Sequence, residues 1–151
     1  MFGIIIGLAV VGFVGFGVMR GVGQASGVDG VQMTVHKTPT CGCCANYIDY
    51  LRRRGADVTV EDHSDLAEIK NQFGITRDEM SCHTTVVGGY FVEGHVPVEV
   101  IASLLKDKPA IRGISLPGMP SGSPGMPGAK RGPFYFDQLG NDGAWSDYTT
   151  M

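Results

Sequence analysis

Three of the four cysteines in this 151-residue chain lie within four residues, at Cys41, Cys43 and Cys44. Closely spaced sulfurs serve two kinds of chemistry, the binding of soft metal ions such as Cu(I) and thiol–disulfide exchange. The spacing of Cys41 and Cys44 is that of a dithiol redox pair, whereas Cys41 and Cys43 are spaced to bridge soft metal ions. A zinc ribbon would need a second close cysteine pair, which the chain lacks. A structural disulfide is a further alternative.

Other soft donors follow later in the chain. Cys82 is followed directly by His83, so this pair offers a thiol and an imidazole, although a loop histidine bonded to the backbone would look the same. Met119 and Met126 belong to a Pro-Gly-Met-Pro unit that occurs twice, seven residues apart. Since such a segment has no core face to fill, the two thioethers are predicted to be Cu(I) ligands or part of a mobile lid.

The cysteine segment lies between a predicted strand and a predicted helix. Residues 31–36 alternate apolar and polar side chains, which indicates a strand. Thr40 is the predicted N-cap of the helix that follows, and Gly55 its predicted end. The apolar stripe of this helix would be Cys44, Tyr47, Ile48 and Leu51. The thiols would therefore lie at a helix N-terminus, where backbone N–H groups favour thiolate over thiol.

The next elements alternate between strand and helix. Residues 57–61 predict a second strand, and Ser64 or Asp65 can cap a second helix that ends at Gly74. The core face of this helix would be Leu66, Ile69 and Phe73. Residues 84–87 and 90–93 are joined by Gly88-Gly89, a strong hairpin signal. Pro97 suits the first turn of a third helix.

The order β-α-β-α-β-β-α predicts an α/β fold of the thioredoxin-like type, a mixed β-sheet with helices on both faces. In that order the loop before the third strand faces the cysteines at the helix start, so Cys82 could complete a four-sulfur site. Thioredoxins carry a cis-proline at that place, and a thiol there favours metal binding over general disulfide exchange. His36 and His63 are interpreted as strand and turn residues, and His95, taken alone, as a cap or surface residue.

The two ends of the chain differ from this middle part. Residues 2–19 carry no charge and are almost wholly apolar, and at about 1.5 Å per residue they would span roughly 27 Å, close to a bilayer core. Residues 1–22 are therefore predicted to be a membrane anchor or a cleaved signal, with 23–30 as a linker. Residues 31–151 form the predicted domain, with a Pro/Gly/Met-rich loop at 109–133 and a C-terminal hairpin. The net charge of −3 argues against a nucleic-acid partner.

Several of these motifs together resemble the CopG-like family of small thioredoxin-like copper-resistance proteins. The resemblance runs from about residue 31 to 128 and rests on residues 37–44, 81–85, 88–90, 93–97 and 116–120. It implies a periplasmic or otherwise extracytoplasmic protein, anchored or secreted, that handles copper. The ligand positions that it implies are Cys41, Cys43, Cys44, Cys82 and His95, with His83, Met119 and Met126 as additional ones.

The expected function is therefore copper binding for resistance or homeostasis. The resemblance implies Cu(I), held as a multinuclear cluster, with a link between thiol redox change and the Cu(I)/Cu(II) couple. Its expected partners are copper ions and an envelope copper exporter or chaperone. The alternative is a thiol–disulfide oxidoreductase with Cys41 and Cys44 as its catalytic pair.

Overall fold

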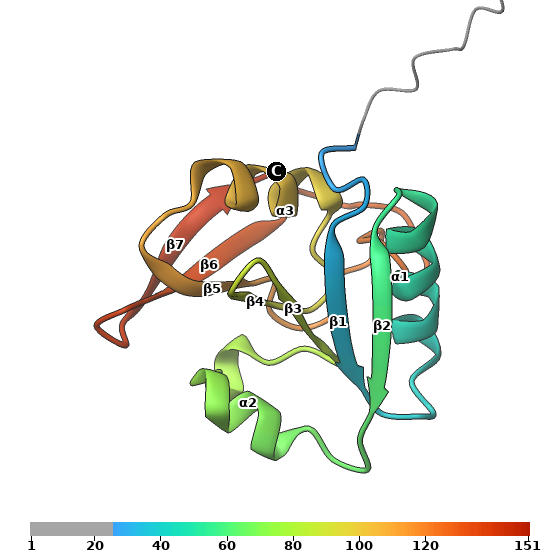
Figure 1. Cartoon of the computed structure of the whole chain (residues 1–151), viewed down its shortest axis with the longest axis horizontal. Coiled ribbons are helices and arrows are strands. Elements are labelled where there is room, and N and C mark those ends of the chain that lie inside the picture. Colours follow the sequence, from blue (N-terminus) through green and yellow to red (C-terminus); the bar gives the residue numbers. More distant parts are fainter. Residues whose placement is uncertain (1–25) are drawn as a thin grey trace, which may run out of the picture.

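A computed structural model describes residues 26–151, which form one seven-stranded sheet with three α-helices (Figure 1). The strands are β1 (Gln32–Lys37), β2 (Asp57–Asp62), β3 (Thr84–Val87), β4 (Tyr90–Glu93), β5 (Ile111–Ser115), β6 (Tyr135–Gly140) and β7 (Trp145–Thr150). The helices are α1 (Gly42–Arg53), α2 (Ala67–Phe73) and α3 (Val98–Asp107), with a 3-10 turn at Arg77–Glu79.

The sheet is mixed, as the sequence predicted. Its strand order is β2-β1-β3-β4-β5-β6-β7. The pairs β1–β2 and β4–β5 are parallel and the other four are antiparallel. Each parallel pair is joined by a crossover through a helix, α1 in the first case and α3 in the second.

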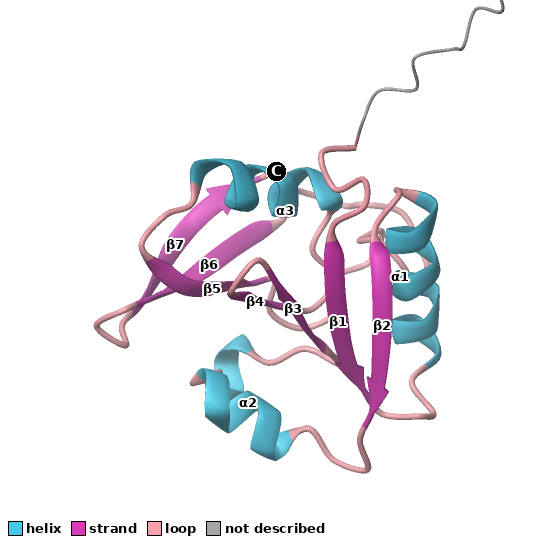
Figure 2. Cartoon of the chain, in the orientation of Figure 1, coloured by secondary structure: helices cyan, strands magenta, loops and turns pink. Residues whose placement is uncertain are grey.

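Helices cover both faces of the sheet. Adjacent residues of β4 point to opposite faces, so Val92 and Phe91 mark the two sides. Val92 packs in the larger core with Tyr47 of α1 and Ile101 of α3, whereas Phe91 packs in a smaller core next to Phe73 of α2. Figure 2 shows α2 set apart from α1 and α3.

The hairpin β3–β4 has the predicted bounds. Gly88 and Gly89 both adopt positive φ, at 57° and 88°, as a tight hairpin link of this kind requires. The antiparallel pairing of Val87 with Tyr90 closes the turn.

Four details of the prediction are wrong. Cys41, not Thr40, is the N-cap of α1, and its Sγ accepts from the backbone N–H of Cys44 at 3.3 Å. Pro97 is the N-cap of α3 rather than part of its first turn. In α2, Lys70 is buried while Ile69 and Phe73 are only half-buried, so the buried face is rotated from the expected stripe. Residues 111–115, assigned to the loop 109–133, form the strand β5.

The predicted C-terminal hairpin is formed by β6 and β7 and extends the sheet. β6 pairs with β5, and Phe136 of β6 is buried in the larger core. The predicted anchor or signal at 1–22, and the start of the linker, lie outside the described residues. Among residues 26–151 no helix is long and apolar enough to cross a membrane.

Candidate metal centre

The four cysteines meet at the start of α1. Cys41 and Cys44 form a disulfide, and Cys43 and Cys82 are free thiols. Cys43 Sγ lies 3.5 Å from Cys41 Sγ and 3.6 Å from Cys82 Sγ. All four sulfur atoms lie within 4.8 Å of one another, although Cys43 and Cys82 are 39 residues apart in the chain. The sequence-based expectation that the loop before β3 faces these cysteines therefore agrees with the structure.

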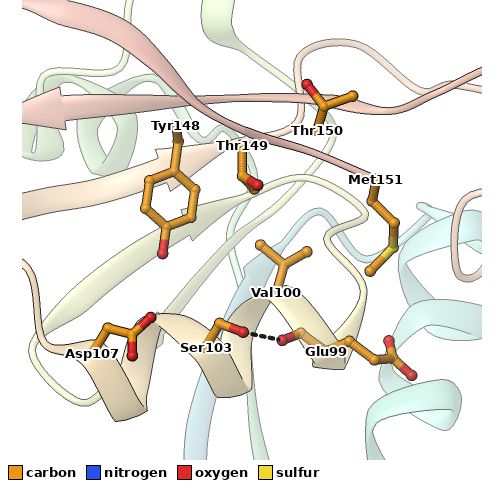
Figure 3. Close-up of a pocket in the computed structure, with 8 residues that line it drawn as sticks. All are labelled: Glu99, Val100, Ser103, Asp107, Tyr148, Thr149, Thr150 and Met151. Atoms are coloured by element: carbon orange, nitrogen blue, oxygen red, sulfur yellow. Dashed lines mark hydrogen bonds between the residues drawn. The ribbon is translucent and has the colours of Figure 1, made fainter.

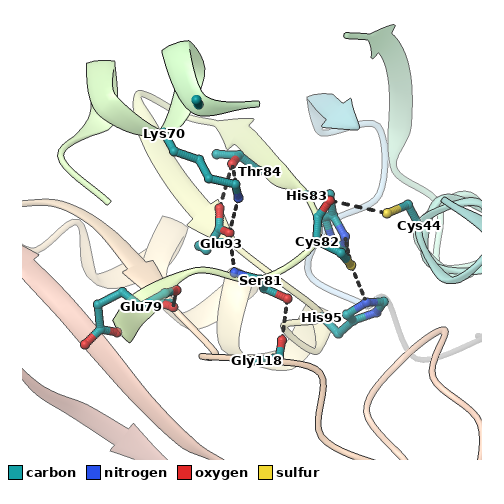
Figure 4. Close-up of polar contacts among 12 residues, drawn as sticks. Cys44, Lys70, Glu79, Ser81, Cys82, His83, Thr84, Glu93, His95 and Gly118 are labelled. Carbon is teal, nitrogen blue, oxygen red and sulfur yellow. Dashed lines mark hydrogen bonds and ion pairs between the residues drawn. The ribbon is translucent and has the colours of Figure 1, made fainter. Parts of the chain in front are cut away.

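Two imidazoles extend this sulfur group. Cys82 Sγ lies 3.0 Å from Nε2 of His95 and 3.4 Å from Nδ1 of His83 (Figure 4). The structure thus brings together six of the predicted ligands: Cys41, Cys43, Cys44, Cys82, His83 and His95. We call these six residues the sulfur–imidazole cluster.

The backbone fixes the orientation of His95. Its Nδ1 lies 2.7 Å from the carbonyl oxygen of Pro124, which can only accept, so Nδ1 carries the proton. Nε2 is then left with a free lone pair directed at Cys82, which is the arrangement of a metal-binding histidine. Burial lowers the pKa of His95, and the bond to Pro124 opposes this only in part, so the ring is held neutral.

His83 is fully buried between aromatic rings. Its ring packs 4.5 Å from that of Tyr47 and 4.7 Å from that of His95, centroid to centroid. Burial, followed by the neighbouring His95 ring and the Lys70 ammonium, lowers the pKa of His83 well below its ordinary value of 6.5. Its Nε2 is buried and has no hydrogen-bond partner among the described residues. A neutral imidazole in this place can bind a metal or hydrogen-bond to the Cys82 sulfur.

The Cys82 thiol is held protonated when no metal is bound. Burial, together with the neighbouring Cys43 thiol, raises the pKa of Cys82 to about 12. A metal ion would therefore have to displace a proton from this thiol, which makes binding dependent on pH.

A buried ion pair, which no sequence motif indicated, positions the Cys82 loop. The carboxylate of Glu93 on β4 is fully buried and pairs with Lys70 of α2. It also accepts from the hydroxyl of Thr84 at 2.6 Å and from the backbone N–H of Ser81 at 2.6 Å (Figure 4). The backbone of Ser81, the residue before Cys82, is thus hydrogen-bonded to a buried side chain of β4.

The Pro/Gly/Met-rich loop contacts the segments that flank the cluster, before Cys82 and along α1. At its first repeat, the N–H of Gly118 donates to Met80, and the Ser81 hydroxyl donates to the Gly118 carbonyl. At its second repeat, Gly125 packs against the backbone of α1, where an added Cβ would lie 2.7 Å from the nitrogen of Tyr47. This close approach explains why a glycine is found there.

Both methionines of the loop are at least partly exposed to solvent. Met119 is 53% exposed, beside the Gly118 contact. Met126 is half-buried and lines a hollow along the outer side of α1, with Asn46, Asp49, Tyr50, Arg53, Gly125 and Pro127. Their role as ligands or as a lid stays a prediction.

A separate hollow between α3 and β7 does not contribute to this centre (Figure 3). It is lined by Glu99, Val100, Ser103, Asp107, Tyr148, Thr149, Thr150 and Met151. These side chains include hydroxyls, carboxylates and one thioether but no thiol or imidazole. The soft-donor chemistry therefore belongs to the cluster at the start of α1.

The fold and the cluster define a mixed α/β protein with soft metal ligands at a helix N-terminus, and known proteins share this fold. Two solved structures described as copper resistance protein CopG, Form 2 and Form 1, are 35% identical to the chain, with TM-scores of 0.74 and 0.73. Each match covers 82% of this chain, and 99% and 98% of the respective solved chain.

A family model described as a protein of unknown function, DUF411, matches residues 79–126, which include Cys82, His83, His95 and both loop methionines. No curated protein matches the chain. The identity and coverage of the two solved structures show that the chain belongs to the CopG family.

Proposed function

We propose that this protein binds copper as Cu(I) in the sulfur–imidazole cluster and serves copper resistance or homeostasis. The observation that carries the proposal is the place of Cys82, whose sulfur lies 3.6 Å from Cys43 Sγ and 3.0 Å from His95 Nε2. Thiolate and imidazole are ligands that Cu(I) prefers. The description of both solved relatives as copper resistance proteins supports the same function.

The number of available ligands depends on the redox state of the cysteines. With the Cys41–Cys44 disulfide closed, the free donors are Cys43, Cys82 and the two histidines. Opening the disulfide takes two electrons and gives two more thiolates. Four thiolates within 4.8 Å of one another can bridge neighbouring ions, so we propose that the reduced protein holds more than one Cu(I).

This arrangement also suggests how copper and thiol redox change would be linked. Two Cu(I) ions that each give up one electron become Cu(II), and the two electrons reduce the Cys41–Cys44 disulfide to two thiolates. The reverse reaction forms the S–S bond and returns both ions to Cu(I). Atoms and charge balance without a further reactant, which is why we propose Cu(I) and Cu(II) as the two states of the cargo.

The surroundings of the cluster fit a thioredoxin-like unit in an oxidising compartment. The order β2-β1-β3-β4, with β3 antiparallel to its neighbours, supports a thioredoxin-like assignment for residues 32–107. A disulfide beside two free thiols suits an extracytoplasmic location, in which disulfides persist. We propose that the protein acts in the cell envelope and exchanges copper with an exporter or a chaperone there.

An anaerobic Cu(I) titration of the full chain in mild detergent, against a competing chelator, tests the proposal. The reduced protein should take up copper tightly, and thiol reactivity should be lost at all four cysteines. The oxidised protein should bind fewer ions and lose reactivity only at Cys43 and Cys82. Absence of uptake by the fully reduced protein would reject the copper function.

A second function, thiol–disulfide exchange, is favoured by one observation, the disulfide between Cys41 and Cys44 at a helix start. If this were the activity, the metal-free reduced protein should reduce a model disulfide at rates like those of a thioredoxin. Inactivity in this assay, combined with tight Cu(I) uptake, would leave copper binding as the function.

A further inference from the structure

A second group of metal-binding side chains lies where β1 and β2 end. His36 on β1 and Glu61 on β2 are directly paired in the parallel register, so both side chains point to the same face of the sheet. His63 follows β2 directly, and its N–H donates to the carbonyl of Lys37 at 2.8 Å. This bond brings the His63 ring back over the same strand ends.

Three donor atoms converge on one point in this group. His36 Nδ1 lies 3.0 Å from His63 Nε2 and 3.3 Å from Glu61 Oε2, and His63 Nε2 lies 3.8 Å from the same oxygen. The nearest point equidistant from three atoms at these separations lies in their plane, about 2.0 Å from each, which is the length of a bond from a transition metal ion to nitrogen or oxygen.

We propose that His36, Glu61 and His63 form a second metal site, for a divalent first-row transition metal ion. The group offers two imidazole nitrogens and a carboxylate oxygen and no sulfur, a donor set suited to Cu(II) and Zn(II) rather than to Cu(I). Cu(II) would bind most tightly, in keeping with the general order of divalent ion affinities.

The local charges and exposure suit an ion that enters from solvent. The Glu61 side chain is 52% exposed and that of His63 27% exposed, so water can complete the coordination. The nearby ammonium of Lys37 is neutralised by Asp62 at 2.7 Å, and this pair lies on the opposite face of the two strands. The single negative charge of Glu61 then favours a cation at this point.

A hydrogen bond between the two rings, with Glu61 as a third partner, would produce similar distances without metal. The two interpretations make different predictions, because only a metal site would take up one metal ion per chain. The site shares no residue with the sulfur–imidazole cluster, so it can be tested when the cluster has been disabled. Failure of this proposal would therefore leave the proposed copper function of the cluster untouched. Failure of the proposed copper function would likewise leave this second site untouched.

The test uses the full chain in detergent with Cys43→Ser and Cys82→Ser, so that the disulfide remains and no free thiol can bind or reduce the probe. Copper(II) sulfate is the probe, measured by equilibrium dialysis and electron paramagnetic resonance, with circular dichroism to confirm folding. We expect one Cu(II) per chain and a spectrum with nitrogen hyperfine structure. Zinc chloride should compete for the same site.

In this background His36→Gln and His63→Gln should each weaken Cu(II) binding by roughly tenfold or more, because loss of even an outer-shell partner costs that much. Glu61→Gln should weaken it as well. Glu99→Gln, which changes an exposed carboxylate outside both metal groups, is the matched control for Glu61→Gln and should leave affinity unchanged. Unchanged affinity in both His36→Gln and His63→Gln, or no stoichiometric uptake by the folded background protein, would overturn the proposal.

Discussion

The carboxylate of Glu93 accepts a 2.6 Å hydrogen bond from the backbone N–H of Ser81. Ser81 precedes Cys82, and Glu93 is fully buried and paired with Lys70. The position of the Cys82 sulfur therefore depends on a charged pair in the interior of the sheet. An interior ion pair is costly to desolvate, which is a reason to look for its role in positioning rather than in stability.

Glu93→Gln should lower the free energy of unfolding by about 3 to 5 kcal/mol, because the ammonium of Lys70 would stay buried without its partner. Urea denaturation measures this change. The double variant Lys70→Met/Glu93→Leu should recover most of the stability, since it removes both charges. It should still bind Cu(I) more weakly, because Ser81 has lost its acceptor.

The exposed pair of Arg54 and Glu99 provides a matched comparison. Both side chains are more than 40% exposed, so Glu99→Gln should change the free energy of unfolding by less than about 1 kcal/mol. Equal losses for Glu93→Gln and Glu99→Gln would contradict a structural role for the buried pair.

Cys82→Ser should weaken Cu(I) binding by at least roughly tenfold, because Cys82 is the residue that joins the thiols of α1 to the imidazole of His95. Competition with a Cu(I) chelator under anaerobic conditions gives the affinity. Ser146→Ala replaces a small side chain on β7, outside the cluster, and serves as a control that should leave the Cu(I) affinity unchanged. Unaltered stoichiometry and affinity in Cys82→Ser would remove this residue from the site.

The double variant Met119→Ala/Met126→Ala should release Cu(I) faster than the parent protein, if the loop supplies thioethers or acts as a lid. Stopped-flow transfer to a chelator measures the rate of release. Met151→Ala, at an exposed position on the C-terminal strand end, is the matched control. Identical release rates in all three proteins would assign both loop methionines to a purely structural role.

The metal-free protein should lose stability as the pH falls below about 6.5. The pKa of His83 is well below 6.5 in the folded state, so between its folded and unfolded values the unfolded chain binds more protons. The free energy of unfolding then rises with pH across this window, by up to about 1.4 kcal/mol per pH unit for one group.

Urea titrations at pH 5.5 and 7.5 check this dependence. His83→Gln should show a smaller difference between the two pH values than the parent, because the glutamine does not titrate. A pH difference as large in the variant as in the parent would show that His83 does not cause it.

Local sequence signals predicted the helices and strands well where a single residue type determines the backbone conformation. Gly88 and Gly89 fixed the hairpin because both need positive φ, and Gly74 ended α2 in the left-handed conformation for the same reason. The alternation of residues 31–36 placed β1, and the cysteine spacing placed the candidate site at the start of α1. The domain boundaries stay a prediction.

Contacts between residues far apart in the chain could not be predicted in the same way. β5 was missed because its residues were assigned by composition to the Pro/Gly/Met-rich loop 109–133. The strand depends on close packing against β4, where a Cβ added to Gly113 would lie 2.3 Å from the carbonyl oxygen of Phe91. The pairing of Lys70 with Glu93 joins residues 23 apart that no periodicity relates. His36 and His63 were interpreted only as strand and turn residues, because their meeting depends on the register of β1 against β2.

The separation of Cys43 and Cys82 along the chain has a consequence for the lifetime of the protein. An ion bound by both thiols would cross-link two segments 39 residues apart, a contact that the unfolded chain cannot keep. At a free ion concentration 100 times the dissociation constant, such binding adds about 2.7 kcal/mol to the free energy of unfolding. Proteases act on opened chains, so the copper-loaded protein should outlast the empty one, and its abundance would rise with the metal supply without any change in synthesis.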